Sequence, residues 1–294
     1  MKNRYSIELT LSMLIFGTIG LFIRNISFPS GVIAFLRGII GAALITAVTY
    51  ISGKLLNFKS ICNNLKFLSI TGTIMGFNWI LLFEAYRYTS VATATLCYYL
   101  APVFVTLLSP FLLGERLTAK KSACSFSALV GMVFVSGVIE NGIGSISEIK
   151  GILLGIGAAV LYSCVIISNR KYSTVGTVDR TVSQLVFASV ALLVYSVITK
   201  DIFTLTADTR SIVFMLSVGI VHTGVAYLLY FDSVKSLKAQ TTAILSYIDP
   251  VVAIILSTVF LKEKMTVLNG VGAVIILGSA LLSEISTKKA KETY

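Results

Sequence analysis

Charged residues are scarce in this sequence, and the few that occur do not form a familiar chemical cluster. Charged side chains make up 13% of the 294 residues, whereas a soluble domain carries about 25%. There is one histidine, and the four cysteines lack the spacing of a metal or redox site. No nucleotide-binding loop, zinc-binding helix or serine-nucleophile turn is present. We therefore expect no metal, no cofactor and no enzymatic activity.

Long hydrophilic segments are also missing, because apolar runs take up most of the chain. Hydrophobic residues make up 56% of the sequence, and its mean hydropathy is +0.90. Runs of about 20 apolar residues, enough to cross a bilayer core as a helix, recur throughout. We predict an all-α integral membrane protein with ten transmembrane helices. The predicted spans are residues 7–23, 31–52, 65–84, 91–113, 120–139, 151–168, 180–199, 211–231, 239–261 and 267–285.

The second half of the sequence repeats the first at an offset of 148 residues. LCYYLAPVFVTLLSPFLLGERLT at 96–118 aligns without a gap with ILSYIDPVVAIILSTVFLKEKMT at 244–266, so that Pro102 matches Pro250. Residues 1–143 and 144–294 are thus two predicted repeats of five helices each. Because five is an odd number, the second repeat enters the membrane from the opposite side, and the repeats are inverted. Such a duplication is usual in secondary transporters, with the substrate site between the repeats.

Acidic residues are fewer than basic ones, 13 against 24, which gives a net charge of +11. If the N-terminus is cytoplasmic, sixteen Lys and Arg residues fall on the cytoplasmic side and eight on the other. The positive-inside rule then predicts a multi-pass protein of the cell (inner) membrane with both termini in the cytoplasm. This bias, together with contact with anionic membrane lipid, explains the excess of positive charge, and no nucleic-acid partner is expected. The oligomeric state is left open.

The repeated segment resembles the fourth and ninth helices of EamA-type members of the drug/metabolite transporter superfamily. In both halves a Pro precedes an apolar stretch that ends near a Glu, and NWILLFEAYRYTSVATA, from residue 78, fits as well. The resemblance covers nearly the whole chain. It implies ten helices in two pseudo-two-fold halves, cytoplasmic termini, and carriage of small organic solutes, often outward. The second half departs from the usual pattern at Asp249 and at Lys262, which stands where Gly is usual.

Two ionisable residues and an amide lie deep in predicted spans. Asp249 is about 15 Å into the ninth span, and Pro250 after it removes a backbone hydrogen bond, so we expect a kink and a carboxyl that faces a cavity. His222 lies near the middle of the eighth span, on a face that corresponds to that of Asn78 in the third. Intramembrane ionisable groups are costly and often functional. One interpretation is that these side chains exchange protons or contact the substrate. The other is that they form hydrogen bonds with buried backbone groups.

Arg37 is roughly 9 Å into the second span. It could extend along the helix to the outer surface, or it could bind a carboxylate by a forked contact. Four further acidic residues lie at the ends of predicted spans, and each is close to a basic residue. We expect them to form ion pairs that act as gates or stabilise the fold. These are Glu84, Glu115, Asp232 and Glu263.

Aromatic residues within the spans suit either an aromatic-lined cavity for organic solutes or packing in the core. Two pairs of them match across the repeats. The candidates are Trp79, Tyr98, Tyr99, Tyr162, Tyr227 and Tyr247.

Together these features predict a secondary transporter of small organic metabolites that works by alternating access. We expect an exporter of amino acids or related amphiphiles; proton coupling is left open. The alternative is a multidrug exporter of organic cations, with Asp249 as the counter-charge. A membrane enzyme would show clustered His, Asp or Glu in its loops, which this sequence does not.

Overall fold

Every regular element in the described part of the computed structural model is helical, which confirms the all-α prediction. The structure describes residues 2–114, 118–135, 139, 145–171, 174–203, 205, 208–237 and 239–289. The helices of the first half are α1 (Lys2–Ile23), α2 (Ser30–Ile51), α3 (Phe58–Asn63), α4 (Leu65–Tyr88), α5 (Val91–Tyr98), α6 (Ala101–Leu113) and α7 (Ala119–Val135).

The second half contains the same kinds of element, with an additional short 3-10 turn and a π-helical segment. They are α9 (Ile146–Lys171), α10 (Thr177–Ile198), η1 (Asp201–Phe203), α11 (Thr209–Ser217), the π-helix η2 (Val218–Val225), α12 (Ala226–Ser236), α13 (Ala239–Ser246), α14 (Ile248–Val259) and α15 (Val267–Lys289).

Seven helical segments are long and apolar enough to cross a membrane, and each overlaps a predicted span. The remaining three predicted spans coincide with the shorter apolar helices Ser122–Val135, Ile248–Val259 and Val267–Ser279. The protein is thus a multi-pass membrane protein, while the count of ten spans stays a prediction. The seven are Arg4–Ile23, Ser30–Ile51, Leu65–Tyr88, Val91–Leu113, Ile146–Asn169, Thr177–Ile198 and Thr209–Ser233.

The fourth and ninth predicted spans are each broken in the middle, and in each a proline explains where the break falls. A proline at position i clashes with the carbonyl of residue i−4 and donates no hydrogen bond to it. Helix α5 ends at Tyr98, four residues before Pro102, and α13 ends at Ser246, four residues before Pro250. At Pro250 the helix is therefore interrupted at one residue, Tyr247, and the first repeat has its equivalent at Tyr99 and Leu100.

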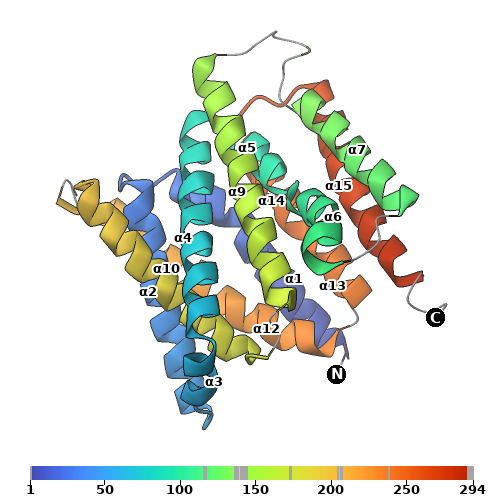
Figure 1. Ribbon diagram of the computed structural model, residues 1–294. Helices are drawn as coiled ribbons and strands as arrows, with labels where there is room; N and C mark the ends of the chain where they lie inside the picture. Colours follow the sequence, from blue (N-terminus) through green and yellow to red (C-terminus); the bar gives the residue numbers. More distant parts are fainter. Residues whose placement is uncertain are drawn as a thin grey trace.

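The helices enclose two hydrophobic cores, and α5 and α9 contribute to both (Figure 1). One hydrophobic core joins α1, α2, α4, α10 and η2, and a second joins α5, α6, α7 and α15. Helices α7 and α15 lie side by side at the edge of the molecule, with Gly131 and Gly272 at their crossing. A Cβ on Gly272 would come within 2.6 Å of the Gly131 carbonyl oxygen, so the two backbones can approach only because both residues lack a side chain.

The packing partners of α9 and α1 correspond to each other. Helix α9 packs against α4, α5 and α6, whereas α1 packs against α12, α13 and α14. In addition α2 packs on α10, and α7 on α15. The contact between α5 and α14 has no equally extensive counterpart between α6 and α13 in the residues described. The two ends of the molecule therefore differ in how tightly they are closed.

Candidate functional site

A central cavity of about 160 Å³ lies beside the end of α5 and the start of α14. Seven of the ten predicted cavity residues line it, and they come from both halves of the chain. They are Arg37, Trp79, Tyr98, Tyr99, Tyr162, Tyr227 and Asp249.

Arg37 is buried, with 4% of its surface exposed, so its side chain does not extend to the outer surface. Its guanidinium lies 4.1 Å from the ring centroid of Trp79 and 5.5 Å from that of Phe83. Its Nε donates a hydrogen bond to Thr223 Oγ1 at 3.1 Å. The ring faces partly compensate the charge. No ion pair of Arg37 occurs among the described residues, although an arginine has five N–H donors.

Thr223 belongs to the π-helix η2, and its own hydroxyl donates to the Val218 carbonyl at 3.1 Å. This i to i−5 bond follows the wider turn of a π-helix, a conformation that is frequent at functional sites. Gly41 of α2 faces Thr223 so closely that an added Cβ would lie 2.4 Å from its methyl group. The position of Arg37 therefore depends on the close packing of α2 on η2.

Asp249 stands in the first turn of α14, directly after the break. Its Oδ2 accepts a hydrogen bond from the Tyr99 hydroxyl at 2.7 Å, and that hydroxyl is also 3.5 Å from the Ser246 carbonyl oxygen. Pro250 leaves this carbonyl without its helical partner. Tyr99 therefore joins the break in one repeat to the break in the other.

The remaining aromatic side chains of the cavity contact one another. Tyr98 stacks on Tyr162 with ring centroids 5.2 Å apart, and Tyr227 meets Phe16 edge-on at 5.6 Å. Each of these rings thus packs on another ring and also lines the cavity. The sequence reasoning missed Tyr86, which follows Met75, Trp79 and Leu82 on one face of α4 at helical spacing.

The other three predicted cavity residues lie outside this lining. Asn78 is fully buried, and its amide donates to the Ala158 carbonyl at 2.6 Å, so it joins α4 to α9. His222 is also buried, with Nε2 2.8 Å from Thr18 Oγ1 and its ring against Phe22. Tyr247 lies beside Tyr99 with ring centroids 6.4 Å apart.

A second, larger hollow, the entrance cavity, has a volume of about 440 Å³ and adjoins the first. Both cavities are lined by Asp249, Tyr99 and Tyr227, among others. From there the entrance cavity extends to the end of α9 and the start of α10, where its lining is polar. The polar residues at that end are Asn169, Thr177, Arg180, Thr181 and Gln184.

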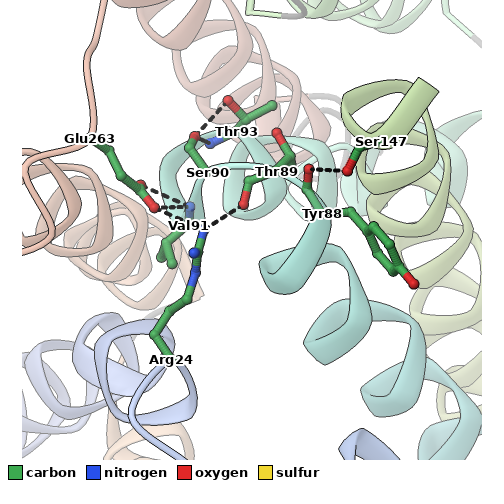
Figure 2. A network of polar contacts seen from close by, with 8 residues as sticks. All are labelled: Arg24, Tyr88, Thr89, Ser90, Val91, Thr93, Ser147 and Glu263. Atoms are coloured by element: carbon green, nitrogen blue, oxygen red, sulfur yellow. Dashed lines mark hydrogen bonds and ion pairs between the residues drawn. The ribbon is translucent and has the colours of Figure 1, made fainter. Parts of the chain in front are cut away.

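At the opposite end a polar cluster joins three parts of the chain (Figure 2). The Glu263 carboxylate, from the loop after α14, accepts hydrogen bonds from the Val91 amide at 2.9 and 3.1 Å. Arg24 at the end of α1 forms an ion pair with Glu263 at 3.1 Å and donates to the Thr89 carbonyl at 2.7 Å. A carboxylate at the N-terminus of a helix is stabilised by its unpaired N–H groups, here those of α5. We call Arg24, Thr89, Val91 and Glu263 the closing cluster.

The predicted acidic gate residues differ in their environments. Glu263 pairs with Arg24, a residue that the sequence reasoning did not single out, rather than with the adjacent Lys264. Glu84 lies 3.8 Å from Arg87 one turn away, and Asp232 is exposed within α12. Glu115 lies outside the described residues. Arg87 also bonds the Phe28 carbonyl and Arg210 bonds Asn25, which adds to the links at the closed end.

Asp208 caps α11 at this closed end and lies outside the apolar spans. Its carboxylate accepts a hydrogen bond from the Ser211 amide at 3.2 Å. Hydrogen bonds from Ser211 lower the pKa of Asp208 below its usual value. The capping interaction is therefore present at neutral pH and is lost as the pH falls through that lowered pKa.

A multi-pass helical bundle with a cavity that is lined by residues of both halves is the architecture of membrane transport proteins. The profile of the EamA-like transporter family matches the chain twice, over residues 6–137 and 149–285. The chain belongs to this family, and is thus a transporter of the drug/metabolite type that its repeat motif indicated.

Several relatives resemble the chain over most of its length. An uncharacterized transporter, YxxF of Bacillus subtilis, is 29% identical, and the match covers 96% of this chain and 90% of that protein. The aromatic amino acid exporter YddG of Ancylobacter novellus is 24% identical over 74% of this chain and 75% of its own. A solved crystal structure, 21% identical, superposes with a TM-score of 0.67 and covers 99% of each chain, which shows a common fold.

Proposed function

We propose that the protein is a secondary transporter that carries small zwitterionic organic solutes, with amino acids as the first class, through the central cavity. A single observation carries this proposal. One cavity, at the point where two broken helices meet, is lined by a buried guanidinium, a carboxyl group and a wall of aromatic rings. Arg37 would hold the solute carboxylate, Asp249 would hold its ammonium group, and the rings would pack on its side chain.

The asymmetry of the two ends supports alternating access. The entrance cavity leads from Asp249 to one end of the molecule, while the closing cluster ties the other end together. By the charge bias of the sequence, the open end would be cytoplasmic, as would both termini, and the membrane would be the cell (inner) membrane. A site open to the cytoplasm suits loading for export, and one relative bears the name of an amino acid exporter.

The corresponding packing of α9 and α1 supports two inverted five-helix repeats, residues 1–143 and 144–294. Rocking of one half against the other would close the entrance cavity and open the far end. Asp249 is the group in this path that could carry a proton, and we propose it as the coupling site if transport is proton-driven. His222 lies against Thr18 and Phe22, away from both cavities, and we assign it a packing role.

The second candidate is an exporter of organic cations, which the aromatic wall and Asp249 would also suit. Arg37 argues against it, since a fixed positive charge in the same small cavity repels a cation.

Proteoliposomes that contain the purified protein separate these two functions. Counterflow of labelled L-phenylalanine, inhibited by other amino acids but not by tetraphenylphosphonium, is expected for the zwitterion carrier. Transport of tetraphenylphosphonium alone would establish the cation exporter instead. Thermal stabilisation gives an independent readout, since a ligand at 100 times its Kd stabilises the native state by about 2.7 kcal/mol.

A further inference from the structure

The entrance cavity holds a second arginine, Arg180, which forms no ion pair with the described residues. Arg180 is in the first turn of α10, half-buried, and lines the cavity. One of its donors, Nη1, is 3.4 Å from the Asn169 carbonyl oxygen. No ion pair includes Arg180 in the part of the chain that the structure describes. The adjacent Asp179 accepts a hydrogen bond from the Asn57 amide at 3.2 Å, on the side of α3.

The polar neighbours of Arg180 are held in place by bonds to one another. The amide of Gln184 donates to Thr71 Oγ1 at 2.8 Å and to Asn169 Oδ1 at 2.9 Å, and so ties α10 to α4 and α9. Asn169 in turn presents its carbonyl to Arg180. The guanidinium therefore stands at the rim of the cavity on a fixed support, with most of its donors uncommitted.

The charges along the two cavities alternate in sign. Arg180 lies in the entrance cavity, Asp249 lines both cavities, and Arg37 lies in the central cavity. An anionic group that enters must pass the Asp249 carboxyl, which repels it when ionised. A positive charge on the near side of that barrier concentrates anions at the entrance, because a cleft with low-dielectric walls focuses the field.

We propose that Arg180 forms an anion-binding entry site, which receives the carboxylate of the solute and passes it over Asp249 to Arg37. This inference rests on the proposed function for the identity of the solute. The site itself is defined by its chemistry: a guanidinium that forks to a carboxylate or binds another small anion.

The chain contains one tryptophan, Trp79, and this residue lines the central cavity beside Arg37. Its fluorescence can therefore report whether a quencher has come through the entrance. The two quenchers are iodide, which is an anion, and acrylamide, which is neutral. Quenching by either one can be measured without any transport by the protein.

Arg180→Gln should lower the Stern–Volmer constant for iodide by about threefold or more, since the local anion concentration falls. The constant for acrylamide should stay unchanged, which also shows that the cavity has kept its shape. Arg180→Lys should retain most of the iodide quenching, because iodide responds to charge. Lys66→Gln is the matched control, because it removes an exposed charge two residues from Asn64, whose side chain bonds Thr174 just before α10.

Equal iodide constants in the Arg180→Gln and Lys66→Gln proteins would overturn the entry site. The entry site would also be overturned if iodide did not quench the fluorescence of Trp79 in the wild-type protein. In proteoliposomes, a severalfold higher KM for L-phenylalanine added at the entrance side, with unchanged kcat, is expected for Arg180→Gln. Charge-dependent quenching without transport of any solute would instead refute the proposed function and leave the anion site standing.

Discussion

At the scale of single residues, Arg37 and Asp249 decide what the cavity can hold. The burial of Arg37 removes the interpretation in which its side chain reaches the outer surface. Its contacts with Trp79 and Thr223 leave other donors free for a ligand. The two charges line one cavity and come from helices of different halves.

Arg37→Gln is expected to weaken binding of L-phenylalanine far more than binding of its amide. Only the carboxylate loses a forked contact, worth about 1.5–3 kcal/mol, or roughly 10- to 150-fold in Kd. Isothermal titration of both ligands against the wild type and the variant measures this. Equal losses for acid and amide would assign Arg37 to structure and favour the organic-cation exporter.

Asp249→Asn should abolish uptake driven by a pH gradient but preserve exchange of solute for solute. Exchange needs no net proton movement, and Asn can still accept the hydrogen bond that Tyr99 donates at 2.7 Å. Vesicle assays with and without an imposed gradient test this. Asp208→Asn is the matched control, because Asn remains a good helix cap at an exposed position away from both cavities. Undiminished gradient-driven uptake in the Asp249 variant would remove it from coupling.

At the scale of elements, the two broken helices and the loops beside them determine which end of the molecule is closed. Each break falls four residues before a proline, so the interruption follows from backbone chemistry. The other end of the α5 half-helix, its N-terminus at Val91, binds Glu263. The closing cluster and the break thus lie at opposite ends of α5.

Glu263→Gln should shift the protein toward a state that is open at the end of the closing cluster. The amide keeps one acceptor for the Val91 amide but loses the ionic contact with Arg24. With both side chains partly exposed, a loss of about 1 kcal/mol, or roughly a fivefold change in population, is expected. The substitution Ala253→Cys, made in a protein without other cysteines, places a thiol in the central cavity. An impermeant thiol reagent added on the side of the closing cluster should label this thiol faster in the Glu263→Gln protein than in the protein with Glu263.

Glu148→Gln, an exposed acid at the start of α9, serves as the control for this measurement. If labelling from the side of the closing cluster is the same in both variants, then Glu263 caps α5 without controlling access.

At the scale of the whole molecule, the packing of one half corresponds to that of the other. Helix α9 packs on α4, α5 and α6, α1 packs on the corresponding helices α12, α13 and α14, and α2 packs on α10. The proposed inverted repeat gives a geometric expectation. Superposition of residues 64–139 on 212–285 in an experimental structure should need a rotation of about 180° about an axis in the membrane plane. An axis along the membrane normal would instead indicate parallel repeats.

The sequence by itself determined what depends on composition and on local chemistry. Scarce charge and long apolar runs dictate membrane helices, because backbone groups in lipid must bond within their own segment. The matched Pro102 and Pro250 indicate where two helices break, although Pro110 lies within the continuous helix α6, and the repeated motif indicated the family. Seven of the ten predicted cavity residues line the central cavity, and two of them, Trp79 and Tyr227, match across the repeats.

Only the tertiary structure decided which polar groups meet across the chain. His222 and Asn78 are as deep as Asp249, yet they bond Thr18 and the Ala158 carbonyl, partners 204 and 80 residues away in sequence. Glu263 pairs with Arg24 across 239 residues rather than with its neighbour Lys264. Helical periodicity gives the face on which a side chain lies but not what packs against that face. That choice depends on close contacts such as Gly41 on Thr223, which only the assembled bundle defines.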